Sequence, residues 1–465
     1  MNQSDFFKTG VIECARGSAV FINDNYSFSF LNTLSKKPYD RSDAFTLSLP
    51  TDGFLKGTTH DGHDIAIYCG SPEDFKTQEV PSIFRIRTNT YLVQCGNCYP
   101  CDWSHFEGIE FCGGTLNDLF SDIPFIKPPT STLKKDSSNN SFPLSKTIST
   151  PLGEIAITIG KLSYEHQSPG EYTFSNKTIY IKLSFTQSIT ISEIFPHLEN
   201  ISKLVSFLTG HKNVGFDEIY LIKHNEPNHT TFRDVQIFQE GYNELVQKSS
   251  LCNICFDELN DFIFPLLQLI YSDSPNNPFC FMDFLPPSSR DVGRMSTDLI
   301  HGIITCLECE FSRIKDSSTP TDSKNESYLV ESNKLSSLVK ELKESVRNYE
   351  IKNGFFSQKT HDMLMGTLKH LSLADADKIN LIYDKYQNFL SILFSDFDFT
   401  PEPSDIEALI IHRNRTTHGV QQILDNRLAM TAFYLVGLIY CMILHSIGIE
   451  DSQLKTLCDK HFLSK

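Results

Sequence analysis

The longest uncharged stretch of the chain lies near its C-terminus and restricts what the neighbouring residues can form. No Asp, Glu, Lys or Arg occurs between Arg427 and Glu450, and residues 428–444 are largely apolar. A helix of this length and composition could cross a bilayer or form the buried centre of a helical bundle. Polar residues such as Thr431 and Tyr434 interrupt the stretch, and its basic flanks are weak. We therefore expect a core helix and no membrane association.

The segment before this stretch has a helical pattern as far back as about residue 297. Amphipathic periodicity predicts helices over 297–314, 332–351, 357–371 and 374–394. A polar loop is expected over 315–327, and Ser404 is a plausible N-cap for one further helix. The Pro- and Ser-rich run at 286–290 precedes these helices, so we place a domain boundary there.

The first part of the chain, to about residue 195, has the pattern of an antiparallel sheet. Short β-prone runs alternate with turn residues, which predicts strands over 17–22, 26–30, 64–68, 84–87, 154–159 and 178–183. Their regular spacing favours a sandwich or a barrel-like sheet. A Ser-, Pro- and Lys-rich stretch over 127–150 is expected to be a long loop.

The predicted fold class is therefore α+β, with two domains. A β-rich N-terminal domain with some helices would span residues 1–285 and act as a sensor or regulator. An all-α domain would span residues 290–465.

The composition limits the partners that the chain can bind. The formal net charge of the 465 residues is −16, which disfavours a large nucleic-acid footprint but not a small site. The N-terminus has no basic start followed by an apolar run, so we expect no signal peptide. The 13 cysteines are then expected to be reduced thiols in the cytoplasm.

The sequence RNRTTH at 413–418 combines groups that suit phosphate chemistry, just before the apolar helix. The guanidinium of Arg413 can hold a phosphate, and the imidazole of His418 can transfer a proton near neutral pH. On a helix, Asn414 and His418 share a face because they are four residues apart. Arg413 lies well round the helix from His418. The Arg413 and His418 side chains can converge only if the helix starts or kinks at Arg413, or if a second copy of the site contributes across a dimer.

In this setting the C-terminal part, about residues 290–465, resembles a HEPN domain. The ribonuclease members of that family carry an Arg, a polar residue and a His at this spacing, which Arg413, Asn414 and His418 match. Over the whole chain, a β-rich domain followed by helices and this module is similar to the ApeA-type anti-phage proteins of bacteria. The wider resemblance rests on architecture and length.

The resemblance implies a metal-independent endoribonuclease that acts as a homodimer, with two copies of the motif at the interface. The 2′-hydroxyl of the RNA would attack the adjacent phosphate. His418 would serve as general base or acid, Arg413 would stabilise the phosphate charge, and Asn414 would orient the substrate. The biological role would be abortive infection after a phage-derived trigger. The alternative is an inactive HEPN-like scaffold that binds RNA or protein.

Neighbouring residues leave the assignment of roles open. Arg415 lies inside the motif and His412 beside it, so either could share the phosphate or proton role. The sequence alone does not rank them against Arg413 and His418.

A second group of candidate residues is rich in cysteine. Cys95, Cys98 and Cys101 have the Cys-x2-Cys spacing of zinc ligands, and Cys69, Cys112 and His105 lie nearby in the sequence. Cys252 and Cys255 could add a distant pair. A structural zinc ion is therefore one interpretation, and buried free thiols are the other. Neither is needed for the proposed cleavage chemistry.

Overall fold

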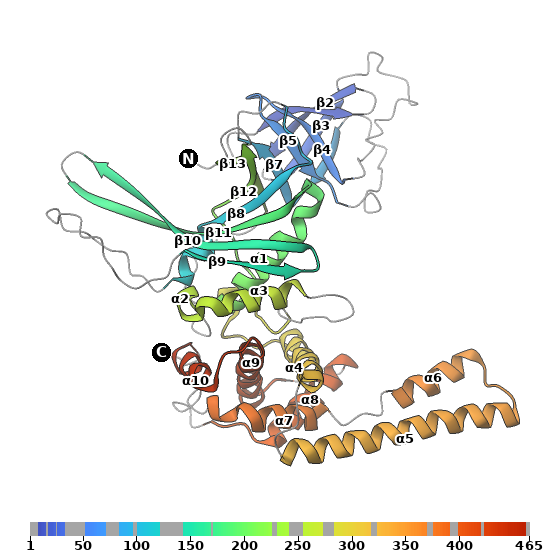
Figure 1. The fold of residues 1–465 in the computed structure, drawn as a ribbon. Coiled ribbons are helices and arrows are strands. Elements are labelled where there is room, and N and C mark those ends of the chain that lie inside the picture. Colours follow the sequence, from blue (N-terminus) through green and yellow to red (C-terminus); the bar gives the residue numbers. More distant parts are fainter. Residues whose placement is uncertain are drawn as a thin grey trace. The chain divides into compact units, whose positions relative to one another are not determined.

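The computed structural model divides the chain into two compact units, each of which is described by itself (Figure 1). The first comprises Met1–Ser272 with Pro287–Arg290, and the second comprises Asp273–Pro286 with Asp291–Lys465. The structure describes residues 8–14, 17–24, 26–32, 52–70, 83–95, 100–120, 143–168, 171–225, 230–240, 254–272, 283–317, 323–369, 375–390, 399–419 and 423–461. An antiparallel sheet and helices together make the fold α+β, as predicted.

In its described residues, the first unit has one continuous antiparallel sheet and three α-helices. Along the chain, the described elements are β1 (Thr9–Cys14), β2 (Gly17–Asp24), β3 (Ser27–Asn32), β4 (Phe54–Thr59), β5 (Asp64–Tyr68), β6 (Ile83–Arg87), β7 (Thr90–Gln94), β8 (Phe106–Cys112), β9 (Leu144–Thr150), β10 (Gly153–Ser168), β11 (Glu171–Ile189), α1 (Ile194–Thr209), β12 (Glu218–Asn225), β13 (Thr230–Gln239), α2 (Phe256–Leu259) and α3 (Ile263–Tyr271). The strand order is β6-β3-β2-β1-β4-β5-β7-β13-β12-β8-β11-β10-β9. Each of the six predicted strands overlaps one of these elements.

The first seven strands curl around a shared apolar core. One cluster of buried side chains draws members from every strand from β1 to β7, including Phe21, Phe28 and Val93. The rings of Phe28 on β3 and Tyr91 on β7 are 5.4 Å apart. These strands are five positions apart in the sheet order, which in a flat sheet would separate them by roughly 24 Å. The curl agrees with the barrel-like alternative of the prediction.

Helices α1 and α3 pack beside the second half of the sheet. The two helices contact each other, and α3 also contacts β9. His197 of α1 lies between them, with its ring 4.6 Å from that of Phe185 and its Nδ1 3.0 Å from the hydroxyl of Tyr271. The side chain is almost completely buried. Burial lowers the pKa of His197 from its ordinary value of 6.5 to about 4.

Parts of the segments predicted to be loops form regular structure. Residues 144–150, the end of the expected loop 127–150, form strand β9, which pairs with β10. The β-prone alternation of this segment was hidden by its Ser and Lys content, because an edge strand with one exposed face tolerates both. Residues 127–142 lie outside the described part of the chain.

All regular elements described beyond residue 290 in the second unit are helical. They are α4 (Thr297–Ser317), α5 (Ser323–Asn353), α6 (Gln358–Lys369), α7 (Asp375–Tyr386), α8 (Pro403–Thr417), α9 (Asn426–Ser446) and α10 (Asp451–His461). Helices α4 and α5 both extend into the loop predicted over 315–327, since polar residues favour an exposed helix surface as readily as a loop. The α5–α6 hairpin extends away from the other helices of this unit (Figure 1).

The apolar helix α9 is the centre of this unit. It contacts α4, α7, α8 and α10, and 67% of its most apolar window is buried inside the structure. It is also the one helix in the described residues that is long and apolar enough to cross a membrane. Packing on four helices accounts for its composition without a lipid environment.

A short segment before α4 lies directly on that helix. The ring of Phe284 meets that of Tyr440 on α9 edge-on, with centroids 5.5 Å apart. The backbone of Asp283 lies so close to α4 that a Cβ atom at Gly302 would overlap the Asp283 carbonyl oxygen. Glycine at position 302 therefore permits the close approach of segment and helix.

We predict that Gly302→Ala destabilises the second unit by about 1–3 kcal/mol, because the added methyl group pushes the backbone of Asp283 away from α4. Gly366→Ala is the matched control. Gly366 lies inside α6 with no atom within 4 Å of the place that the added methyl group would occupy, and this change should stabilise by about 0.5–1 kcal/mol. Chemical denaturation of both variants measures the difference. Equal effects at the two positions would contradict the close contact.

We also predict that stability falls as the pH is lowered from about 6.5 to about 4. In that window the unfolded chain binds a proton at His197 that the folded protein excludes, so acid favours unfolding. The full effect corresponds to about 3 kcal/mol. Denaturation at several pH values should show this loss in the wild type and much less of it in His197→Gln. The exposed-site control His60→Gln should behave like the wild type.

Candidate active site

Helix α8, which carries the predicted site, is fixed firmly at its start. Pro403 occupies its first turn, Glu402 is the N-cap, and Glu402 and Asp405 form a reciprocal capping box. The cap is thus two residues earlier than the predicted Ser404. Arg427 at the start of α9 donates to both carboxylate oxygens of Asp405, at 2.5 and 2.7 Å. These hydrogen bonds hold the pKa of Asp405 below its usual range.

The other end of α8 carries the motif and ends at it. Thr417 is the last helical residue, His418 is the C-cap, and Gly419 follows with a left-handed φ of 79°. The His418 amide donates to the carbonyl oxygens of Asn414 and Arg415. Asn414 and His418 are both exposed to solvent. They therefore lie together on the last turn, as their four-residue spacing predicts.

Arg413 points elsewhere, towards α4. Its Nη2 donates to Oε1 of Glu308 at 2.6 Å, and the Arg413 side chain is only 20% exposed. Within one protomer the structure thus places Arg413 against a neighbouring helix and leaves Asn414 and His418 at the solvent face. The helix starts at Pro403, so convergence through a helix start at Arg413 does not apply, and the route through a second copy stays a prediction.

Helix α4 contributes two residues that sequence reasoning missed. Glu308 is the partner of Arg413, and His301, two turns earlier on the same face, lies at the end of α8. Its Nε2 is 3.4 Å from Oγ1 of Thr416 and 3.3 Å from Oγ1 of Thr417. Their seven-residue spacing was the available signal, but such spacing is common on any amphipathic helix.

The structure separates the two residues whose roles were open. His412 is only 3% exposed, and its Nε2 makes no hydrogen bond in the part of the chain that is described. It cannot contact RNA without a local opening of the fold. Arg415 is exposed on the same turn as Asn414 and His418, so it is available to bind a phosphate.

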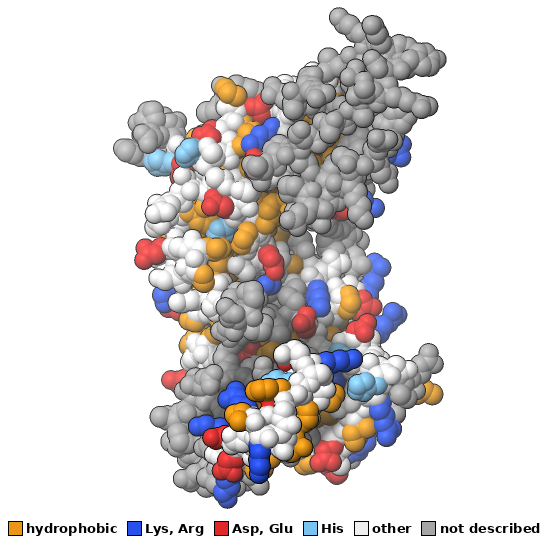
Figure 2. Space-filling view, turned by 90° about the vertical axis from the view of Figure 1, so that its right-hand side faces the viewer, with side chains coloured by type: hydrophobic (Ala, Val, Ile, Leu, Met, Phe, Trp, Pro, Cys, Tyr) orange, Lys and Arg blue, Asp and Glu red, His pale blue; other side chains and the backbone are white. Residues whose placement is uncertain are grey.

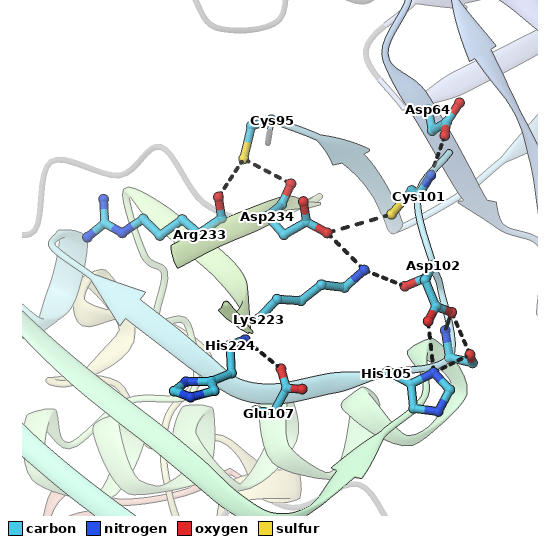
Figure 3. Close-up of polar contacts among 11 residues, drawn as sticks. Asp64, Cys95, Cys101, Asp102, His105, Glu107, Lys223, His224, Arg233 and Asp234 are labelled. Carbon is cyan, nitrogen blue, oxygen red and sulfur yellow. Dashed lines mark hydrogen bonds and ion pairs between the residues drawn. The ribbon is translucent and has the colours of Figure 1, made fainter. Parts of the chain in front are cut away.

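The cysteine cluster lies in the first unit, around a buried carboxylate (Figure 3). The thiol of Cys95 is 3.3 Å from the backbone oxygen of Asp234. The thiol of Cys101 is 3.9 Å from Oδ2 of the same residue. Lys223 forms an ion pair with Asp234 at 3.1 Å, and Asp234 is completely buried. Burial raises the pKa of Cys95 to about 11 and of Cys101 to about 12, so both thiols are protonated.

Two of the other predicted zinc ligands in the described residues have different partners: His105 bonds to Asp102 and Ser104, and Cys112 bonds to Glu110. Cys98 and Cys252 lie outside the described residues. Among the residues that are described, no group of three His, Cys, Asp or Glu side chains could hold a metal ion. These residues by themselves do not supply a zinc site.

Comparisons with protein-family models, with curated proteins and with solved structures found no match. On the face drawn in Figure 2, Lys and Arg side chains are interspersed with Asp and Glu rather than gathered in one basic surface. A candidate nucleic-acid site on this acidic chain therefore depends on a few local cations, of which Arg413 and Arg415 are two.

We predict a measurable coupling between Arg413 and Glu308. A double-mutant cycle with Arg413→Gln, Glu308→Gln and both together should give about 0.5–1 kcal/mol in the free energy of unfolding. The value should fall at high salt, because both side chains are partly exposed. A coupling of zero at low salt would show that the ion pair does not form in solution.

Proposed function

We propose that the chain is a HEPN-type, metal-independent endoribonuclease that acts as a homodimer. The observation that carries the proposal is the last turn of α8, where Asn414, Arg415 and His418 are exposed together and Arg413, on the same turn, is paired with Glu308. An imidazole and guanidinium groups can support RNA cleavage without a metal ion, because the nucleophile belongs to the substrate. All these groups lie on the helix that precedes the central helix α9.

The proposed chemistry is attack of a ribose 2′-hydroxyl on the adjacent phosphate. His418 exchanges a proton with the reacting oxygens, and Arg413 stabilises the charge that builds on the phosphate. Asn414 orients the substrate. The products are a 2′,3′-cyclic phosphate and a 5′-hydroxyl. The need for a 2′-hydroxyl selects RNA over DNA.

The homodimer is proposed because the groups diverge within one protomer. Arg413 turns to Glu308 on α4, whereas His418 faces solvent. A two-fold interface around the end of α8 would bring the His418 of each copy towards the Arg413 of the other. In a closed dimer of this kind the same surface is used by both partners.

For the biological role we propose anti-phage defence in the bacterial cytoplasm, on the resemblance to ApeA-type proteins. The β-rich first unit would sense a phage-derived trigger, and RNA cleavage would then stop phage production. The ion pair between Glu308 and Arg413 supports a restrained resting state, since a carboxylate occupies the guanidinium that the phosphate needs.

We predict that His418→Ala reduces RNA cleavage by the full-length protein by at least about 100-fold, because a general acid–base group is lost. The variant should keep its fold, since His418 is exposed within the single chain. It should also stay dimeric, which its size in solution would check. His60→Ala, at an exposed position of the first unit, is the matched control and should retain full activity. Gel assays and mass spectrometry of product ends measure the outcome.

A single 2′-deoxy substitution in the RNA should block cleavage at that linkage only. Undiminished cleavage by His418→Ala, or products without a cyclic phosphate, would overturn the mechanism. Intact RNA under all activating conditions would favour the second candidate, an inactive HEPN-like scaffold that binds RNA or protein. The net charge of −16 and the engaged state of Arg413 are the observations on its side.

A further inference from the structure

The residue that carries a further inference is His301, on helix α4. It approaches the end of α8 through two hydroxyl groups, Thr416 at 3.4 Å and Thr417 at 3.3 Å from its Nε2. Thr417 is the residue directly before His418. His301 is also partly exposed. The imidazole of His301 therefore lies at the same end of α8 as that of His418, although the two residues are 117 positions apart in the sequence (418 − 301).

The hydrogen bonds around His301 favour one of its two neutral tautomers. The hydroxyl of Thr416 donates to the carbonyl oxygens of His412 and Arg413, at 3.0 and 2.9 Å. The hydroxyl of Thr417 donates to the Arg413 carbonyl oxygen at 2.8 Å. Because these contacts are shorter than those to His301, the arrangement favours hydroxyl oxygens that accept and a His301 Nε2 that donates. The other nitrogen, Nδ1, is then the one that can accept a proton.

The surroundings of His301 favour its neutral form. Burial lowers its pKa, and the positive charge of Arg413 and the nearby His412, both on α8, lower it further. Asp298 on its own helix acts in the opposite direction, and the net effect is a lowered pKa. Glu308, two turns along α4, is engaged with Arg413. A neutral imidazole is the form that a general base needs.

We propose that His301 is the second proton-transferring residue of the site and takes the proton from the 2′-hydroxyl of RNA. This inference rests on the proposed ribonuclease function and extends it. The 2′-oxygen forms a bond to phosphorus while its proton passes to His301. The bond from phosphorus to the 5′-oxygen breaks, and that oxygen receives a proton from His418. No oxidant, metal or other reactant is consumed.

The assignment of the acid role to His418 and the base role to His301 follows from their exposure and from the neighbouring charges. His418 is at the solvent face of the last turn, where its imidazole is open to an approaching substrate oxygen. His301 is held between helices beside a guanidinium, where protonation is disfavoured. His301 is therefore suited to the role of base, and the exposed His418 is assigned the role of acid.

The test uses single-turnover cleavage of RNA by the full-length protein over a range of pH. His301→Gln keeps a side-chain donor for the two threonine hydroxyls but cannot accept a proton at neutral pH. We expect its rate to fall at least about 100-fold and the acidic limb of the pH–rate profile to disappear. Thr417→Val removes one hydroxyl contact while leaving both imidazoles, and it should keep that limb. A loss of the limb in Thr417→Val but not in His301→Gln would overturn the inference.

An RNA with sulfur in place of the bridging 5′-oxygen distinguishes the loss of the general acid from the loss of the general base. A thiolate leaves without a proton, so this substrate should restore His418→Ala towards the wild-type rate and leave His301→Gln slow. The reverse pattern would overturn the assigned roles. A normal rate and pH profile for His301→Gln, with His418→Ala inactive, would overturn this inference and leave the ribonuclease proposal standing. A wild-type protein that cleaves no RNA would overturn both.

Discussion

The burial of α9 is the constraint on which the second unit depends. Its surface is apolar nearly all round, so α4, α7, α8 and α10 must cover it to keep it from water. Covering one helix on several sides brings α4 and α8 into contact with each other. Their remaining polar side chains then meet at the edge of the bundle, where His301 and Glu308 face the motif of α8. The position of the candidate site thus follows from the way in which α4 and α8 cover α9.

That arrangement gives the cationic and titratable groups unequal environments. Arg413 is tied to a carboxylate between helices, whereas Asn414, Arg415 and His418 remain in water on the last turn. A phosphate that approaches this turn meets these three exposed side chains first and must compete with Glu308 for Arg413. The acidic net charge of the chain adds to this barrier. A small site whose Arg413 is already paired with Glu308, on an acidic protein, is consistent with the proposed nuclease that is inactive at rest.

The fold was predictable from the sequence where periodicity was strong. The helices and the six predicted strands arise from local patterns of apolar residues, and α9 could be located from a lack of charge alone. The curl of β1–β7 could only be suggested, because it depends on which strands meet across the core, as Phe28 and Tyr91 do. The strand β9 was assigned to a loop because an exposed edge carries few apolar residues.

The candidate site was predictable only in part, for a similar reason. Asn414 and His418 are related by helix geometry, so their shared face followed from spacing. Glu308 lies 105 positions from Arg413, and His301 lies 115 positions from Thr416. No local rule connects residues so far apart, and on α4 both look like ordinary polar positions of an amphipathic helix. Tertiary packing alone brings them together.

The two ends of α8 are held by different neighbours. Its first turn is fixed by Pro403, the capping box and the paired hydrogen bonds between Asp405 and Arg427 of α9. Its last turns contact α4 through the Thr416 and Thr417 hydroxyls and through the ion pair of Arg413 with Glu308. Helix α8 therefore bridges α9 and α4, so the position of the His418 imidazole depends on that of α4.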